Sequence, residues 1–348
     1  MHKHIVSVTR LFLGAAILVG AIFGCDARRD PVEIVAKGCW KSLLGQNARF
    51  GPMTMTSDGK KLAVSFFRHE TDKSADRRLI VIDLNTGAHQ TIWLDQLSPR
   101  VAGSVDRLKW MEGDTTLEYS TETTLMRLRL ADLRSERVMD CIGCAHFDRS
   151  RDGAQADLTP ISGALRLVVN GDTSTLLPAR LTDLFAPYYV SWSPNGQYLA
   201  VQLDRRKPVS DDNFDRLAVI TFSGPSVTVG DFWKWYPAGY PHWIDDTSIA
   251  ETRNDPRAIV RRRAQDGASQ AVVNFDQVPG LAVELGKRSI FEGQLSADGG
   301  RAIFEADEQG IGQIYVVDLS CVKSSGEVDK VRPLANDNMA QAEQLRSR

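Results

Sequence analysis

One short pattern recurs along this chain: a tight polar turn that is followed at once by an apolar strand. The pattern is sharp at three places, namely Ser57-Asp58-Gly59 before KKLAVSFF, Ser193-Pro194-Asn195-Gly196 before QYLAVQL, and Ser296-Ala297-Asp298-Gly299 before GRAIFEA. An Asp or Asn before Gly supplies the positive φ that a tight reversal between strands requires. Two of the turns are followed by a further strand that ends in Asp-Leu, at 79–84 and 314–319. Repetition of such a unit predicts an array of antiparallel β units.

Weaker copies of the turn fill the intervals between the sharp ones. Taking one turn residue of each unit as its marker gives Gly59, Gly113, Gly153, Gly196, Asp246 and Gly299. Successive markers are 54, 40, 43, 50 and 53 residues apart, which leaves room for roughly four short strands in each unit. The sequence therefore predicts an all-β, six-bladed β-propeller of four-stranded antiparallel blades. Unrelated hairpins in a β-sandwich are the alternative, and the even spacing argues against them.

The repeat also carries a family resemblance. The Ser-Pro-Asn-Gly turn with Leu-Ala-Val after it, and the later strand Ile-Tyr-Val-Val-Asp-Leu, resemble the WD40-like propeller repeats of periplasmic TolB-like proteins. They are also similar to the propeller domains of prolyl-oligopeptidase-type peptidases. The resemblance extends over about residues 48–335 and is sharp in three units. It implies a propeller fold and, by analogy of fold, a role in the assembly or integrity of a bacterial envelope.

The N-terminal segment has the organisation of a bacterial lipoprotein signal. Basic side chains precede an uncharged apolar run of 14 residues, 11–24, which is shorter than the roughly 20 residues that a membrane-spanning helix needs. The run ends in Gly24-Cys25, as in a lipobox, although Phe23 is larger than the residue usual there. We therefore predict lipidation at Cys25 and a lipid anchor on the periplasmic side of a bacterial membrane. Ordinary cleavage and an uncleaved anchor are the alternatives.

These features divide the chain into four parts. We assign residues 1–24 to a signal peptide, 25–38 to a tether, 39–335 to the β-propeller domain and 336–348 to a flexible polar tail. With 348 residues and 43% apolar content, the chain can bury the core of one large all-β domain. We expect it to be a monomer.

The cysteines suggest two disulfides. Once Cys25 is lipidated four cysteines remain, and an even number in an exported chain favours disulfide bonding. Cys39 precedes the first unit and Cys321 follows the last strand of the final unit, and closure of a propeller brings these two places together. The predicted pairs are Cys39 with Cys321 and Cys141 with Cys144. The second pair leaves two alternatives open, a redox centre and half a zinc site with His146.

The charge balance argues against nucleic acid as a partner. The chain has 42 basic and 44 acidic residues, which gives a formal net charge of −2. Its densest basic run is Arg261-Arg262-Arg263. We interpret this run as a solvated strand end, with binding of a phosphate or a lipid headgroup as the alternative.

No motif in the sequence predicts an enzyme or a cofactor. There is no Gly-x-Ser-x-Gly turn, Walker loop, HExxH helix or EF-hand loop. The acidic segment 211–215 lacks the glycine and the distal glutamate of a calcium loop. One polar residue of each predicted inner strand could line a central channel or, by alternation, sit between blades: Thr54, Lys109, Asp148, Ser191, His242 and Gln294. That set holds one carboxylate, so we expect no metal, no cofactor and no catalysis.

Aromatic residues gather before two of the predicted inner strands. Tyr188 and Tyr189 lead into the fourth, and DFWKWYPAGYPHW at 231–243 leads into the fifth. Loops that lead into inner strands open onto one face of a propeller, and Tyr and Trp are favoured anchors at protein interfaces. Trp192 and Trp243 are interpreted as core residues. The predicted partner-binding residues are Tyr188, Tyr189, Trp235, Tyr236, Tyr240 and His242.

The sequence thus predicts a non-catalytic, lipid-anchored envelope propeller that binds or scaffolds an envelope protein or peptide. The alternative is that a small ligand or glycan uses the central channel, or that the channel holds a metal-dependent hydrolase.

Overall fold

A computed structural model describes residues 32–45, 48–68, 77–97, 99, 105–121, 123–140, 147–150, 155–157, 166–169, 172–175, 185–205, 215–223, 226–235, 240–308 and 311–324. Several predictions fall on other residues: the signal peptide 1–24, Cys25, the acidic residues 211–213, the pair Cys141 and Cys144, Tyr236 and the tail 336–348 all lie outside the described residues.

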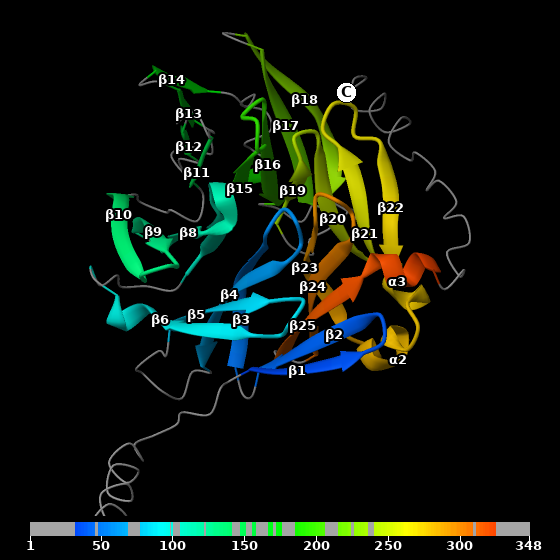
Figure 1. Cartoon of the computed structure of the whole chain (residues 1–348). Coiled ribbons are helices and arrows are strands. Elements are labelled where there is room, and N and C mark those ends of the chain that lie inside the picture. Colours follow the sequence, from blue (N-terminus) through cyan, green and yellow to red (C-terminus); the bar gives the residue numbers. More distant parts are fainter. Residues whose placement is uncertain are drawn as a thin grey trace, which may run out of the picture.

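Five four-stranded antiparallel sheets form blades around a central axis, and each blade takes its strands in sequence order (Figure 1). The first blade consists of β3 (Ala48–Met55), β4 (Lys61–Arg68), β5 (Arg77–Asp83) and β6 (His89–Trp93). The second consists of β7 (Arg107–Trp110), β8 (Thr116–Ser120), β9 (Thr124–Arg129) and β10 (Arg134–Asp140). The third consists of β11 (Phe147–Arg149), β12 (Gln155–Asp157), β13 (Arg166–Val169) and β14 (Asp172–Thr175). The fourth consists of β15 (Phe185–Trp192), β16 (Tyr198–Arg205), β17 (Asp215–Ser223) and β18 (Ser226–Trp235). The fifth consists of β19 (His242–Asp245), β20 (Ser248–Asn254), β21 (Arg257–Arg263) and β22 (Ser269–Asn274).

The remaining sheet, which we call the closing sheet, joins the two ends of the described chain. Its order is β1 (Val32–Lys37), β2 (Trp40–Gly45), β25 (Ile311–Asp318), β24 (Arg301–Glu308) and β23 (Ser289–Leu295). The prediction of six four-stranded blades is therefore wrong. The described residues form five four-stranded blades, and the closing sheet has a fifth strand because β1 pairs with β2 along its whole length.

The extra strand lies inside the predicted tether, 25–38. Its sequence VEIVAK is rich in β-branched residues, which fit the pleated surface of a sheet. Gly38 follows it with φ 62° and lets the chain reverse into β2. Residues 32–37 of this segment therefore belong to the closing sheet.

A disulfide joins Cys39 to Cys321 at this closure, as the ring topology predicts. Cys39 stands next to β2, and Cys321 lies in α3 (Leu319–Ser324), the helix that follows β25. Their Cα atoms are 5.5 Å apart although 282 positions separate them in sequence. The backbone N–H of Asp318 donates to the Cys39 carbonyl at 2.8 Å, so the disulfide reinforces strands that already pair.

The repeated polar turns share one hydrogen-bond pattern. The Thr56 hydroxyl donates to Asp58 Oδ1 at 2.7 Å and accepts the backbone N–H of Lys61 at 2.9 Å. The pairs Ser193 with Asn195 and Ser296 with Asp298 repeat this arrangement at 2.8 Å and 2.6 Å. The short Ser or Thr side chain thus forms hydrogen bonds within its own turn. This explains why each turn has a Ser or Thr three residues before its Gly.

Two of these turns meet where the ring closes. The backbone N–H of Ala297 donates to the Ser57 carbonyl at 2.9 Å. Gly59, with φ 68°, lies so close that a Cβ there would come within 2.9 Å of Ser296 Cβ. Glycine at position 59 is therefore required both by the backbone conformation and by the close approach of the neighbouring turn.

The helices among the described residues are short. Besides α3 they are η1 (Leu94–Gln96), η2 (Glu112–Asp114), η5 (Phe275–Gln277) and α2 (Leu281–Leu285). In this part of the chain none has the length and apolar character that crossing a membrane requires.

Candidate functional site

The inner strands bring their first residues to one end of the propeller axis. These strands are β3, β7, β11, β15, β19 and β23, each the first strand of its sheet in the chain, and neighbouring ones contact one another around the ring. We call the end where they begin the leading end. The opposite end, where they run into the polar turns, is the turn end.

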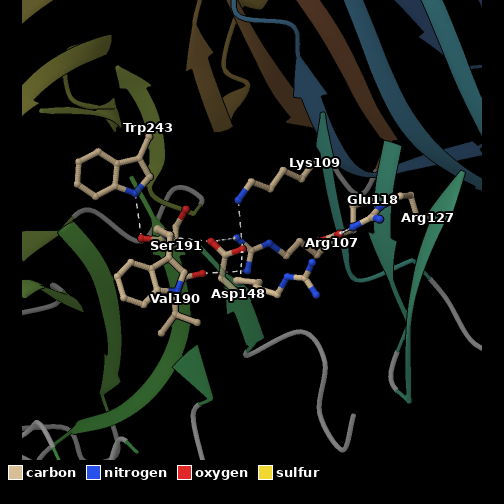
Figure 2. A network of polar contacts seen from close by, with 10 residues as sticks. Arg107, Lys109, Glu118, Arg127, Asp148, Val190, Ser191 and Trp243 are labelled. Atoms are coloured by element: carbon tan, nitrogen blue, oxygen red, sulfur yellow. Dashed lines mark hydrogen bonds and ion pairs between the residues drawn. The ribbon is translucent and has the colours of Figure 1, made fainter. Parts of the chain in front are cut away.

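A buried ion pair ties three inner strands together on one side of the axis (Figure 2). Arg107 of β7 lies 2.9 Å from Asp148 Oδ2 of β11, and Arg107 Nη1 donates to the Val190 carbonyl of β15 at 3.0 Å. Asp148 also accepts the backbone N–H of Trp192 at 2.7 Å, and Lys109 Nζ lies 3.3 Å from its other oxygen. The Asp148 side chain is only 3% exposed, so this carboxylate is almost completely enclosed by donors.

The environment of Asp148 favours its ionised form. Burial alone would raise the pKa, but the charges of Arg107 and Lys109 and the hydrogen bonds from backbone amides outweigh it and hold the pKa of Asp148 below its ordinary value. Asp148 therefore contributes stability above its unfolded pKa, and that stability is lost as the pH falls through the folded pKa.

A second polar group occupies the other side of the axis. Gln294 of β23 donates to the Met53 carbonyl of β3 at 2.6 Å and accepts the backbone N–H of Met55 at 3.0 Å. His242 of β19 lies 3.4 Å from the Gln294 amide and 3.2 Å from Glu292 Oε1. Side chains of the inner strands thus contact each other across blade boundaries on both sides.

Three tyrosines form a stacked group at the leading end, which we call the tyrosine cluster: Tyr188, Tyr189 and Tyr240. The ring of Tyr240 stacks on Tyr189 at 4.4 Å and on Tyr188 at 5.9 Å, and the hydroxyls of Tyr188 and Tyr240 are 3.3 Å apart. Arg107 lies 5.0 Å from the centre of the Tyr189 ring, which connects the cluster to the buried ion pair. Tyr189 is buried, whereas Tyr188 is 40% exposed.

A β-bulge explains why two consecutive tyrosines contact the same ring. Side chains of a regular strand alternate between its faces. The register of β15 against β16 shifts between Pro187 and Tyr189, so Tyr188 is the extra residue of a bulge. A bulge redirects a side chain and is frequent beside binding sites.

A similar irregularity in β23 lies at Glu292, which contacts His242. The register of β23 against β24 shifts between Phe291 and Gln294, and Glu292 within this shift has φ 36°, a conformation that is costly for a residue with a side chain. Glu292 is buried. Burial, together with the negative charges of Glu292 and Asp307, raises the pKa of Glu305 on β24 to about 8.

Replacing Glu305 with glutamine is expected to remove a pH dependence from the stability of the protein. The folded pKa of about 8 lies above the ordinary value of 4.5, so the carboxyl contributes stability that is complete below about pH 4.5 and is lost as the pH rises through about 8. The full difference corresponds to ~5 kcal/mol, and we expect roughly 2–3 kcal/mol because the side chain keeps some solvent contact. Urea unfolding from about pH 5 to about pH 9 measures it.

The matched control for Glu305→Gln is Glu136→Gln, since the Glu136 side chain on β10 is well exposed. Relative to the control, Glu305→Gln should become more stable than the wild-type protein as the pH rises. Parallel pH profiles for Glu305→Gln and the wild-type protein would contradict this account of the carboxyl.

The structure brings together some of the predicted partner-binding residues and separates others. Tyr188, Tyr189, Tyr240 and His242 lie at the leading end. Trp235 is 1% exposed and packs in the core with Trp233, so it cannot serve as an exposed anchor. The physical reason is that Trp235, the last residue of β18, belongs to a hydrophobic core that the fourth blade shares with Ile249 of the fifth blade.

Two tryptophans connect neighbouring inner strands. Trp110 Nε1 donates to the Thr54 carbonyl at 3.0 Å, and Trp243 Nε1 donates to the Ser191 carbonyl at 2.9 Å. These two tryptophans follow Lys109 and His242 in their strands, so the same contact recurs in two different blades. Trp243 is thus a packing residue between blades, which agrees with its interpretation from sequence.

The basic run Arg261-Arg262-Arg263 has acidic partners. Arg262 is buried and lies 2.6 Å from Glu251, which is also buried. Arg261 pairs with Asp245, and Arg263 lies 2.8 Å from Asp266. These contacts give the run a structural role within the fifth blade.

Sequence reasoning missed Arg107, Glu292 and Glu305. No turn or motif marks them, because their importance comes from contacts between blades and from bulges. Phe291, 37% exposed beside Glu292, was missed for the same reason. Within the described part of the chain, no group of three or more His, Cys, Asp or Glu side chains is placed to hold a metal ion.

Comparison with known proteins gives similarity of architecture alone. No protein family matches the chain, and no curated protein matches it. Similar solved structures include oligogalacturonate lyase from Vibrio parahaemolyticus, with a TM-score of 0.45 and 11% identity over 83% of this chain and 97% of that one. A putative TolB from Agrobacterium tumefaciens has a TM-score of 0.42 and 15% identity over 66% of this chain and 78% of that one. The β-propeller domain of the trilobed protease from Pyrococcus furiosus has a TM-score of 0.40 and 10% identity over 78% and 82%.

These similarities are too distant to carry a function from one protein to another. The propeller fold itself follows from the order and pairing of the strands.

Proposed function

We propose that the protein binds a protein partner at the leading end of its propeller, without catalysing a reaction. We further propose that a lipid on Cys25 holds it at a membrane of a bacterial envelope, where the propeller faces the periplasm. The observation that carries the binding proposal is the tyrosine cluster. In it the exposed ring of Tyr188 stacks on Tyr240, and Tyr240 stacks in turn on the buried ring of Tyr189.

The composition of the leading end supports binding of a protein. Among the described residues, the large apolar side chains that remain exposed are Leu133, Tyr188, Val283 and Phe291. Two of these four, Tyr188 and Phe291, lie in the first halves of inner strands at the leading end. Exposed aromatic residues that are already held in place are typical anchors, because little side-chain entropy is lost when a partner covers them.

The rigidity of the surrounding contacts supports the same proposal. Arg107 contacts Asp148, Val190 and the Tyr189 ring, so the cluster rests on a network that spans three blades. A ring of blades presents such a surface without a change of shape. The lipobox-like Gly24-Cys25 supports the membrane location.

Replacing Tyr188 with alanine is expected to weaken partner binding by about tenfold or more, since a buried aromatic anchor at an interface contributes at least ~1.4–2 kcal/mol. The measurement is quantitative affinity capture from detergent-solubilised envelopes with the full chain as bait. Val283→Ala is the control, because Val283 is exposed on α2, away from the inner strands.

Two results would contradict the proposed function. One is capture of the same proteins by the Tyr188→Ala variant and the wild-type chain. The other is a stoichiometric divalent metal ion in the purified wild-type chain, which would favour a channel-based activity.

A further inference from the structure

We propose that the leading end of the propeller faces the membrane that holds the lipid of Cys25, and that the tyrosine cluster docks on a protein embedded in that same membrane. This inference rests on the proposed function and names the class of partner. Two observations carry it: the end of the propeller at which β1 begins, and the short stretch of chain that joins β1 to Cys25.

The register of the closing sheet places the start of β1 at the leading end. The inner strand of this sheet is β23, whose first residue, Ser289, lies at the leading end. From the second residue of β23, cross-strand pairing runs in one row to the outermost strand through Ile290, Ala306, Gln313, Leu44 and Glu33. Val32 precedes Glu33, so β1 begins at the leading end and runs toward the turn end.

The same strand lies at the outer edge of the ring. β1 is the outermost strand of the closing sheet (Figure 1). Neighbouring strands are ~4.8 Å apart, so β1 lies roughly 19 Å from the inner strand β23. The chain therefore enters the propeller at the rim of its leading end.

The chain between the lipid site and β1 is short. Val32 follows Cys25 by seven positions, and a fully extended backbone covers at most about 25 Å over that length. A diacylated cysteine is held at the surface of its membrane. A lipid on Cys25 therefore keeps Val32, and with it the rim of the leading end, within about 25 Å of the membrane surface.

The opposite orientation needs more chain than is available. The seven residues of β23 separate the two ends of the propeller by roughly 20 Å before the polar turn is added. With the turn end against the membrane, the segment from Cys25 to Val32 would have to run almost fully extended along the whole side of the closing sheet. With the leading end toward the membrane, it has length to spare. Tyrosine is also enriched at membrane–water interfaces, and Tyr188 is exposed at this end.

The size of the gap favours a membrane-embedded partner. A compact domain of 100 residues has a radius of gyration of ~13 Å and is roughly 34 Å across, which exceeds the reach of about 25 Å. A loop or a short terminal segment of a protein in the same membrane fits beneath the tyrosine cluster. Anchoring both proteins in one membrane also raises their effective concentration, so a few aromatic contacts suffice.

The test measures energy transfer from the full lipidated chain to the membrane. The chain is reconstituted into vesicles of phosphatidylethanolamine and phosphatidylglycerol that contain a headgroup-labelled acceptor lipid. A fluorescent amino acid replaces either Ser289 or Ala297, two exposed residues at opposite ends of the inner strand β23. We expect the donor at position 289 to lie closer to the acceptor plane, by up to ~25 Å. Lys60 provides a second position at the turn end, and circular dichroism shows whether each labelled chain is folded.

The outcomes separate this inference from the proposed function. Mass spectrometry first shows whether Cys25 carries the lipid, and an unmodified Cys25 would overturn the proposed membrane location together with the inference. With Cys25 lipidated, equal distances for the two donors, or a shorter distance for position 297, would overturn the inference and leave binding at the leading end standing.

The class of partner has its own readout. A photoreactive residue at Tyr188 should give an adduct whose partner stays in the membrane during alkaline extraction, because it spans the bilayer. An adduct with a soluble protein that alkaline extraction releases would overturn the inference, although it would still support the proposed function.

Discussion

Replacing Asp148 with alanine is expected to lower the free energy of unfolding by about 3–5 kcal/mol. The change leaves the buried Arg107 guanidinium without its carboxylate and removes the acceptor of the Trp192 backbone N–H. A buried charge without a partner costs far more than an exposed one. Guanidinium chloride unfolding, followed by circular dichroism, measures the loss.

The matched control for Asp148→Ala is Asp132→Ala. Asp132 also pairs with an arginine, Arg129, but both side chains are about half exposed, and exposed pairs of this kind contribute little to stability. Asp148→Ala combined with Arg107→Met should recover part of the loss, because it removes the unpaired charge. If Asp148→Ala and Asp132→Ala cost the same, the ion pair does not hold the inner strands together.

Removing the disulfide with Cys39→Ser and Cys321→Ser is expected to cost roughly 5 kcal/mol. The bond closes a loop across 282 positions, and a cross-link across so long a loop strongly restricts the unfolded chain. The folded state should survive, because β2 still pairs with β25 through backbone hydrogen bonds. Guanidinium chloride unfolding with and without a reductant measures the effect.

The reductant supplies the internal control for this prediction. The wild-type chain should lose stability on reduction, and the double variant should be insensitive to reductant under the same conditions. Equal stability of the oxidised wild-type chain and the double variant would show that the closure depends on strand pairing alone.

The propeller architecture could be predicted from the sequence because its signal is local, whereas the prediction of six four-stranded blades was wrong. The hydroxyl of Ser296 and the carboxylate of Asp298 close their turn within six residues, so the motif is visible wherever it occurs. The closure was predictable for a related reason: Cys39 and Cys321 flank the first and last strands of one ring. The number of strands in the closing sheet was not predictable, because no local sequence signal indicates that β1 pairs with β2 and extends the sheet.

The candidate site was only partly predictable. Tyr188, Tyr189 and Tyr240 stand out as aromatic residues before inner strands, but the bulge that turns Tyr188 and Tyr189 toward Tyr240 depends on the register of β15 against β16. Trp235 lies in the same aromatic-rich part of the sequence, but it is buried. Its position depends on the pairing of β18 with β17, which the sequence pattern does not show. The raised pKa of Glu305 comes from its burial and from the neighbouring charges of Glu292 and Asp307, which a sequence pattern does not reveal.

The most direct test of the binding face is photo-crosslinking in living cells, with a photoreactive phenylalanine analogue placed at Tyr188 of the full chain. The comparison position is Lys60, whose exposed side chain lies beside the first polar turn, at the turn end of the axis. The analogue at position 188 should give a discrete adduct with an envelope protein, and the analogue at position 60 should not. Equal adducts from both positions, or an adduct from position 60 alone, would contradict binding at the leading end.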